Sequence, residues 1–441
     1  MARKAVRLDA DVVVAGGGPG GCTVARELSK KGKRVVIVEK GVYSKAFYGS
    51  LLAPIRYMEK FGFLNRTIEG DWVVQGKGVG GGTLIYAGSA FEPNLARWRQ
   101  YGIDLSEYLA EARRDCRVNR VPDHLIGEGA KRLVQAAQEL GQPWEPMDKF
   151  VDMERCEASC PMCPYGCPKG AKWTGMEFAE EAERNGAVVL PRVEVRDIMV
   201  EQGVAVGVRA RGSNGQEYEI GGTAVVCAAG AIGTARIIKR SGLDDAGSWL
   251  TGDPAIMVFG YLKEGKGGMS DMLFAAGWHD EENGIVYNNL SGPRLYWSLQ
   301  RLQEKPQRPV NALFRWGKAI GVDIKIADEL DGQVFLDGRV SKPRTSADLS
   351  KLERGAAIAE KILARAGCDP HNIDQSGVII GHQAATMRIG KLLDSNLETL
   401  IRNLYCCDTS VTPDAFGVPP TLTIVALGKR LSRHLETVLQ S

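Results

Sequence analysis

The sequence lacks the features that would place it across a membrane or on a nucleic acid. It contains no uninterrupted apolar stretch of about 20 residues, the length that a membrane-spanning helix needs. Its 56 basic and 53 acidic side chains leave a net charge of only +3, too little to attract nucleic acid or an anionic surface. We therefore expect no transmembrane segment and no nucleic-acid partner. Hydrophobic residues make up 44% of the chain, enough for a sizeable core.

We also expect no secretory signal. The N-terminal segment carries basic residues and then an apolar run, but acidic residues and glycines interrupt that run. The ten cysteines do not suggest a secreted disulfide lattice either, because four of them are packed into residues 156–167. We therefore expect a cytoplasmic protein.

Glycine, by contrast, is abundant, with 53 of 441 residues, and several clusters of it follow β-type runs. The first cluster lies between a strand expected at Asp11–Ala15 and a helix expected at Cys22–Lys31. A second expected strand, Arg34–Val38, ends at Glu39. The order of strand, G-x-G-x-x-G turn, helix, strand and acid is typical of a dinucleotide site.

Each residue of this motif has a physical role in such a site. Gly16 permits the tight turn, and Gly18 lets the backbone approach a pyrophosphate at the helix N-terminus. Gly21 allows close packing of the helix against the strand, and Glu39 can accept a hydrogen bond from a ribose hydroxyl. This segment alone leaves FAD and NAD open as the cofactor.

Four more segments carry motifs in a fixed order. Residues 76–93 hold a second glycine cluster, GKGVGGGT, and residues 227–242 begin with CAAGAIGTAR. Residues 382–390 read HQAATMRIG, and residues 403–410 read NLYCCDTS. Together these motifs resemble those of the glucose–methanol–choline (GMC) oxidoreductase family, and their wording is closest to the cholesterol oxidase branch.

The resemblance implies that FAD is the cofactor and that a small alcohol-type molecule is the substrate. It implies that His382 is the catalytic base, which takes the hydroxyl proton while a hydride passes to flavin N5. An imidazole suits this task because its usual pKa of about 6.5 lies near the operating pH. The cofactor-binding positions that the resemblance adds are Gly80, Gly81, Gly82, Thr83, Ala229, Gly230 and Asp408.

The sequence departs from the family pattern at two positions. The family places a second His or Asn beside the base, but this chain reads GVPPTLT at residues 417–423, with Pro419 at that position. Proline offers no hydrogen-bonding side chain. The family's Asn in the second glycine cluster corresponds to Tyr86. Both departures weaken any transfer of substrate class and of oxidase activity from the family.

The clustered cysteines form a second candidate site. Cys156, Cys160, Cys163 and Cys167 have the spacing C-x3-C-x2-C-x3-C and precede a proline, which resembles the ferredoxin pattern with one extra residue. A 4Fe-4S cluster, a zinc ion, disulfides and free thiols all remain open. A cluster accepts one electron at a time and would indicate export to a protein or quinone acceptor.

The order of the motifs predicts an α/β protein with two domains. A Rossmann-like FAD-binding domain is expected to be discontinuous, at residues 1–95, 185–245 and 380–441. A connecting region follows at 96–184, with the cysteine-rich loop at 156–168, and a substrate domain built on an antiparallel sheet at 246–379. A helix is expected at Ala347–Ala366, ending before Gly367, and four strands between 187 and 220 are expected to form an antiparallel meander.

These observations favour an FAD-dependent dehydrogenase that oxidises a CH–OH group. Two alternatives remain open: a flavin and iron–sulfur protein that relays electrons without a small substrate, and a flavoprotein lyase in which the flavin is structural.

Overall fold

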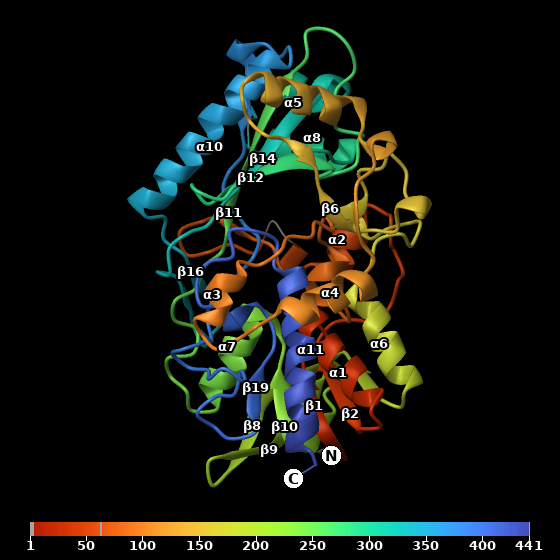
Figure 1. Cartoon of the computed structure of the whole chain (residues 1–441), viewed down its shortest axis with the longest axis vertical. Coiled ribbons are helices and arrows are strands. Elements are labelled where there is room, and N and C mark those ends of the chain that lie inside the picture. The colour runs from red at the N-terminus through yellow and green to blue at the C-terminus, as the bar shows by residue number, and fades with distance from the viewer. Residues whose placement is uncertain (1–3, 62–63, 305, 441) are drawn as a thin grey trace.

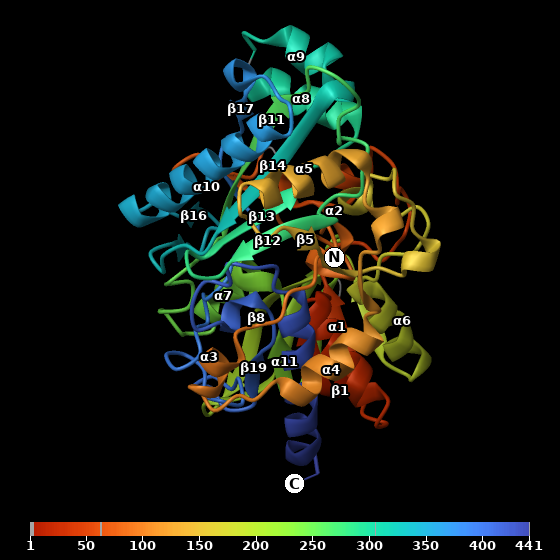
Figure 2. The same ribbon diagram turned by 45° about the horizontal axis from the view of Figure 1, so that its top comes forward.

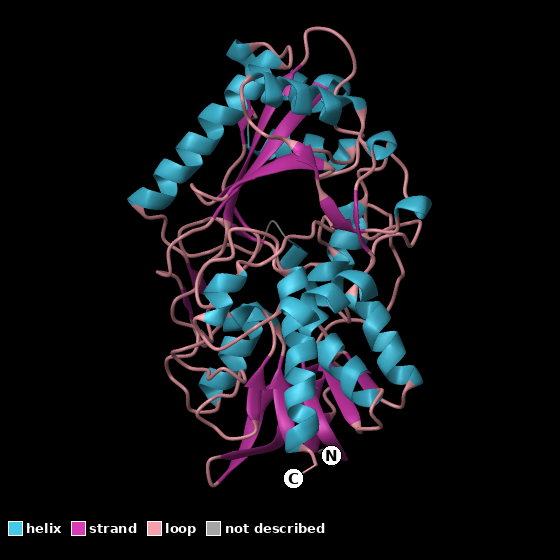
Figure 3. Ribbon diagram, in the orientation of Figure 1, coloured by secondary structure: helices cyan, strands magenta, loops and turns pink. Residues whose placement is uncertain are grey.

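The computed structural model describes residues 4–61, 64–304 and 306–440, and Figure 1 shows them as two regions stacked along the long axis. Each region contains its own sheet, as the colouring of Figure 3 makes clear. The chain begins and ends in the same region, whose helices and strands come from both termini. This arrangement is the predicted α/β fold, a Rossmann-like domain joined to a second domain.

The sheet of the first region has the strand order β7-β2-β1-β10-β9-β8. Its strands are β1 (Val6–Ala15), β2 (Val35–Glu39), β7 (Val188–Pro191), β8 (Val193–Glu201), β9 (Val204–Gly212) and β10 (Glu217–Cys227). A further strand, β19 (Leu404–Cys406), lies parallel to the end of β10. Strands β7, β2, β1 and β10 are mutually parallel, so this half of the sheet is of the Rossmann type.

Burial explains why these segments form the centre of the sheet. Residues 12–15 of β1 and 35–39 of β2 are almost fully buried, as parallel strands covered on both faces must be. Helix α1 (Pro19–Ser29) packs between α6 (Gly175–Arg184) and α11 (Thr421–Val438), and α4 (Ser106–Asp115) packs on α11. Helix α7 (Gly230–Arg240) contacts β8.

One detail of the predicted meander is wrong. Strands β8, β9 and β10 are antiparallel, but β7 lies parallel to β2 at the sheet edge. The reason is the connection: β7 follows helix α6, and a strand that returns after a helix joins its sheet in parallel. Tight hairpins connect the other three strands, and hairpins produce antiparallel pairs.

The second region contains an eight-stranded sheet in the order β3-β18-β11-β14-β13-β12-β5, with β17 beside β11. Its strands are β3 (Trp72–Val73), β5 (Glu145–Pro146), β11 (Pro254–Tyr261), β12 (Ala276–Asp280), β13 (Ile285–Asn289), β14 (Ala319–Ile326), β17 (Asp374–Gln375) and β18 (Ile379–Ile380). All of its pairs are antiparallel except β18 with β3.

The two faces of this sheet differ in chemistry. Helices α5 (Glu128–Glu139) and α10 (Ser346–Arg365) lie across one face, as Figure 2 shows, and isoleucine and valine side chains of β14 pack against them. The opposite face of β14 presents Gly321, Asp323 and Lys325, by the alternation of a strand. That face is turned toward the first region.

The structure confirms the expected long helix. Thr345 caps α10 by accepting from the amide of Asp348, and the Asp348 carboxylate accepts from the amide of Thr345 in return. The helix ends just before Gly367, whose φ of +98° only glycine adopts readily.

The remaining elements are short. They are α2 (Ala53–Tyr57), α3 (Leu95–Arg99), α8 (Arg294–Glu304), α9 (Pro309–Phe314), β4 (Val118–Arg120), β6 (Asp148–Phe150), β15 (Gln333–Val334), β16 (Val340–Ser341) and eight 3-10 turns. Among the described residues, no helix combines the length and the apolar composition that crossing a bilayer requires.

Candidate active site

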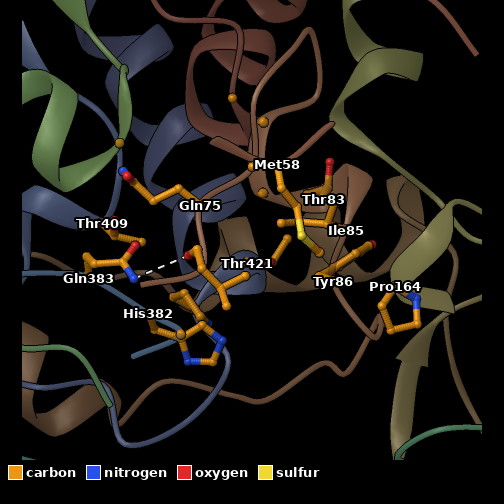
Figure 4. A pocket seen from close by; sticks show the side chains of 18 of the residues that line it. Met58, Gln75, Thr83, Ile85, Tyr86, Pro164, His382, Gln383, Thr409 and Thr421 are labelled. Atoms are coloured by element: carbon orange, nitrogen blue, oxygen red, sulfur yellow. Dashed lines mark hydrogen bonds between the residues drawn. The ribbon is translucent and has the colours of Figure 1, made fainter. Parts of the chain in front are cut away.

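A cavity of about 560 Å³ lies where the two regions meet. Figure 4 shows its interior, with His382 and Gln383 on one side and Tyr86 and Pro164 on the other. Four of the motifs contain segments of small residues, at 16–21, 80–83, 228–234 and 404–408, and members of all four line the cavity. Of the predicted site residues, those that line it are Gly16, Gly18, Glu39, Gly81, Gly82, Thr83, Ala229, Gly230, His382 and Asp408.

The first glycine turn brings two strand ends into close contact at one end of the cavity. Gly16 has a φ of +116°, and a β-carbon there would stand 2.3 Å from the carbonyl oxygen of Ala228. Helix α1 then begins at Pro19 with Gly18 as its N-cap, and no side chain accepts from its first amides. No acidic side chain occupies its first turn. Such a helix N-terminus is suited to a phosphate group.

Glu39 connects three glycine segments around this end of the cavity. Its Oε2 accepts a hydrogen bond from the amide of Gly17 at 2.9 Å, and its Oε1 accepts from the amides of Gly41 at 2.7 Å and Gly78 at 3.2 Å. The carboxylate is therefore fixed by the backbone. Its role as a ribose acceptor stays a prediction.

Two of the predicted cofactor residues do not line the cavity. A β-carbon on Gly21 would stand 2.3 Å from the carbonyl oxygen of Gly16, so Gly21 permits helix and strand to pack closely, as predicted. Gly80 has a φ of +109° and donates its amide to the carbonyl of Gly17 at 2.6 Å. These two glycines contribute to the site indirectly, because they allow the backbone segments that line the cavity to pack closely.

Asp408 joins the segments at the end of β19 and the start of α7. Its Oδ2 accepts from the amide of Gly230 at 2.9 Å and from the hydroxyl of Thr234 at 2.6 Å, and its Oδ1 accepts from the amide of Ser410 at 2.8 Å. Burial raises the pKa of Asp408, and the hydrogen bonds from Ser410 and Thr234 act in the opposite direction. The acid thus holds the predicted cofactor residues Ala229 and Gly230 in place.

His382 lies two residues after the end of β18, and its side chain is 22% exposed, toward the cavity. Its Nδ1 is 3.1 Å from Oδ2 of Asp253, a fully buried residue that precedes β11. Burial and the nearby cation of Lys325 lower the pKa of His382 well below 6.5. An imidazole in this state is neutral at neutral pH and can accept a proton.

Sequence reasoning missed Asp253. Its Oδ1 accepts from the amide of Gly417 at 3.0 Å, and its own amide donates to Oδ1 of Asp328 at 3.0 Å. Burial raises the pKa of Asp253, while Lys325 acts to lower it. An acid just before an apolar strand was visible in the sequence, but nothing there connected it to a histidine 129 positions away.

The substrate side of the cavity is largely apolar. Its charged residues are Asp323 and Lys325, which lie on the cavity face of β14. The hydroxyl of Tyr86 donates to the carbonyl of Trp173 at 2.7 Å, and Pro419 also lines the cavity. Apolar lining comes from Met257, Phe259, Met269, Leu273, Leu290 and Trp297.

The four clustered cysteines all line one small cavity of about 20 Å³, and all four are free thiols. Within residues 4–61, 64–304 and 306–440, no three histidine, cysteine or acidic side chains converge as a single metal ion would require. Two buried lysines lie near the thiols. Lys172 donates to the carbonyl of Cys163 at 2.7 Å, and Lys149 donates to that of Leu273 at 2.5 Å.

The backbone groups and small residues that line the main cavity fit a dinucleotide such as FAD. The free amides at the start of α1 suit a pyrophosphate. The glycines at 81 and 82 leave the wall without side chains, and a β-carbon on Gly82 would meet no atom within 4 Å. An extended ligand can therefore lie along the wall from Glu39 toward His382.

Comparison with known proteins agrees with this geometry. The chain is 32% identical over 305 residues to an uncharacterized GMC-type oxidoreductase of Mycobacterium tuberculosis (strain ATCC 25618 / H37Rv), covering 64% of this chain and 48% of that protein. It is 26% identical over 522 residues to a long-chain-alcohol oxidase of Arabidopsis thaliana, covering 99% of this chain and 68% of the relative. The chain therefore spans about half the length of the mycobacterial relative.

Solved structures share the fold. Pyridoxine 4-oxidase from Mesorbium loti superposes with a TM-score of 0.73 at 15% identity, over 97% of this chain and 99% of that one. A formate oxidase superposes with a TM-score of 0.70 at 14% identity, over 99% of both chains.

The GMC oxidoreductase family models match residues 10–254 and residues 339–428, so both models together cover the two ends of the chain. This match confirms the family that the sequence motifs indicated, while the cholesterol oxidase branch stays a prediction. With a Rossmann-type sheet, a cavity bordered by the family's glycine segments and a histidine facing that cavity, the chain belongs to the GMC oxidoreductase family.

Proposed function

We propose that the protein binds FAD and oxidises a CH–OH group of a small alcohol-type substrate. The observation that carries the proposal is that His382 opens into the same cavity as the four small-residue segments. The long-chain-alcohol oxidase and the pyridoxine 4-oxidase among its relatives support an alcohol as the substrate. The apolar lining next to β14 favours a substrate with an apolar body.

FAD supplies the hydride acceptor when it is bound. Gly16, Gly18 and Glu39 would hold its adenosine and pyrophosphate, and residues 81–83 would lie along the ring. His382 accepts the hydroxyl proton of the substrate at Nε2, because Nδ1 faces Asp253. The Asp253 carboxylate orients the imidazole and stabilises it once it is protonated.

Anaerobic mixing with a panel of alcohols tests this function. The panel contains short and long primary alcohols, polyols and pyridoxine, and the readout is loss of the flavin's visible absorbance. We expect at least one alcohol to bleach the flavin of the wild type, and His382→Asn to retain flavin but lose at least about 10²-fold of the reduction rate.

The panel also separates the two alternatives. A lyase would cleave a cyanohydrin such as mandelonitrile without bleaching its flavin. An electron relay would be reduced by a protein donor and by no alcohol, and His382→Asn would leave that reduction unchanged. Either pattern contradicts the proposal.

We also propose that Cys156, Cys160, Cys163 and Cys167 hold a 4Fe-4S cluster, which would pass electrons singly to a protein or quinone acceptor in a reducing compartment such as the cytoplasm. Support comes from charge. Lys149 is fully buried, Lys172 is 3% exposed, and neither forms an ion pair among the described residues. Buried cations without anions are costly, and thiolates bound to iron would supply the missing negative charge.

Burial lowers the pKa of Lys149, and the nearby thiols of Cys163 and Cys156 act in the opposite direction. Burial lowers the pKa of Lys172 to about 8, and the nearby thiols of Cys163 and Cys167 act in the opposite direction. A four-iron cluster is also larger than one ion, so its thiolates need not converge on a single point as zinc ligands do. The loop must spread to receive it, because the cavity has room for about one water molecule.

Metal analysis of anaerobically purified protein tests the cluster. We expect about four iron atoms and four labile sulfides per chain, as a 4Fe-4S centre contains. Cys160→Ser should lose most of that iron, whereas Cys368→Ser, at a buried thiol outside the loop, should retain it. Intact protein that contains no iron would contradict this proposal and leave the flavin function standing.

A further inference from the structure

The candidate active site has no polar side chain at the position where a second hydrogen-bond donor for the substrate is expected. Pro419 lines the cavity at the place where the resemblance led us to expect a second His or Asn, and it has no group that can donate a hydrogen bond. Tyr86 does not replace that side chain, because its hydroxyl is bonded to the carbonyl of Trp173. A second donor for the substrate oxygen must come from another element.

Lys325 on β14 has the required position. It lies opposite Ala255 of β11, on the face of the sheet that lines the cavity. Its Nζ is 3.5 Å from the point where a β-carbon on Gly381 would stand, and Gly381 immediately precedes His382. The ammonium group is therefore close to the backbone that carries the base.

The ammonium group of Lys325 is free to bind a ligand. The residue is only 8% exposed, yet in the described part of the chain its Nζ has no hydrogen bond and no carboxylate within 4.0 Å. Asp323, two positions earlier on the same face, is instead 3.5 Å from the amide nitrogen of Asn288. Buried lysines without a partner are rare, because burial of an unpaired charge is costly.

The positive charge of Lys325 would stabilise a substrate oxygen that becomes negative beside His382. Lys325 acts on the titration of His382, Asp253 and Asp323 alike, so it lies within electrostatic reach of all three. The acids alone would oppose removal of a proton from the substrate. The cation of Lys325 offsets that opposition.

We propose that Lys325 is a catalytic residue that donates a hydrogen bond to the hydroxyl oxygen of the substrate and stabilises the negative charge that forms there. This inference rests on the proposed function and extends it. The O–H bond breaks and its proton goes to Nε2 of His382. The C–H bond breaks and its electron pair goes with the hydride to the flavin, so the carbinol becomes a carbonyl. Lys325 keeps its own proton throughout.

The inference can be tested before any substrate is known. Sulfite is an anion that adds to N5 of oxidised flavins and bleaches them, so in the proposed site its oxygens would lie near the place of the substrate oxygen. We expect the flavin-replete Lys325→Met protein to bind sulfite at least about tenfold more weakly than the wild type, the effect of losing one charge-assisted hydrogen bond. Lys325→Arg should restore most of the affinity.

Lys361→Met is the matched control, since Lys361 is an exposed lysine of α10 on the other side of the sheet. Should Lys325→Met fold poorly, Lys325→Gln removes the same charge and keeps a polar side chain. Sulfite affinity equal to that of the wild type in either flavin-replete variant overturns the inference. A wild type that takes up no flavin would instead end the proposed function, so the two failures are distinguishable.

Discussion

Nδ1 of His382 lies 3.1 Å from Oδ2 of Asp253, although the two residues are 129 positions apart in the sequence. The other oxygen of Asp253 accepts from the amide of Gly417, so the carboxylate cannot rotate without losing a hydrogen bond. An acceptor fixed at Nδ1 keeps the proton on that nitrogen and leaves the lone pair of Nε2 for the substrate. In the proposed mechanism, Asp253 is thus a positioning residue for His382.

Asp253→Asn should therefore disable the base without removing the cofactor. The amide of Gly417 requires an oxygen, so the NH2 group of the new asparagine would face Nδ1 and shift the imidazole proton to Nε2. We expect the rate of flavin reduction by an alcohol to fall by about 10² to 10⁴-fold, as for a wrong tautomer elsewhere. Stopped-flow reduction measures this rate. Asp369→Asn, on a surface turn, is the control, and an unchanged rate in Asp253→Asn would refute the role.

The pH dependence of flavin reduction should reflect the environment of His382. Burial and the cation of Lys325 lower its pKa well below 6.5, so the imidazole stays neutral down to that lower value. The base is lost only as the pH falls through the lowered pKa. We therefore expect a constant rate across pH 6.5 and a decline only at clearly lower pH. Lys325→Met should move this decline upward, while a wild-type decline centred at or above 6.5 would contradict the account.

Gly82→Val should weaken cofactor binding without unfolding the protein. Gly82 has ordinary backbone angles, and a β-carbon there meets no protein atom within 4 Å, so the larger side chain extends into the cavity. We expect FAD to bind at least about tenfold more weakly, because close approach of the ligand to the backbone is lost. Calorimetric titration of the apoprotein with FAD measures the affinity. Gly377→Val, at an exposed glycine with equally open surroundings, should bind FAD normally.

A buried network of ion pairs should stabilise the packing of α11 against α1 and α4. Lys429 is 4% exposed and lies 2.7 Å from Asp115 and 3.1 Å from Glu27, and Arg26 also contacts Asp115 at 2.8 Å. Lys429→Met leaves these acids with one cation fewer, so we expect a loss of about 3 kcal/mol in unfolding free energy. Denaturant titration checks this value, and the exposed control Lys361→Met should change by less than about 0.5 kcal/mol.

The sign of the pH effect gives this prediction a second test. Burial raises the pKa of Asp115, but the hydrogen bonds from Lys429 and Arg26 outweigh it and lower the pKa below the usual 3.8. The stability that Asp115 contributes is therefore present above pH 3.8 and is lost as the pH falls through the lowered value. The difference between wild type and Lys429→Met should shrink in acid. A difference that grows there would contradict the network.

The glycine segments of the candidate cofactor site could be predicted from the sequence because their signals are local, and their role in binding FAD stays a prediction. A glycine that must adopt a positive φ, such as Gly16, or pack against backbone, such as Gly21, is dictated within a few residues of its own strand. The order of the motifs then predicted a Rossmann-like domain joined to a second domain. The domain limits at 95, 185, 245 and 380 stay predictions.

The substrate half was not accessible in the same way. The pairing of β11 with β18 and β14 brings Asp253 and Lys325 close to His382. The register between strands that are distant in the sequence cannot be predicted from the residues of either strand alone. The parallel placement of β7 was missed for a related reason, since it depends on helix α6 returning the chain to the sheet edge. Pairing of remote strands, rather than local pattern, completes the active site.

The most direct test of the account is the visible absorption spectrum of the freshly purified protein together with its flavin content. We expect a yellow protein that contains one FAD per chain and loses its colour with an alcohol only while His382 is intact. A colourless protein that takes up no FAD when the cofactor is supplied would contradict the central claim.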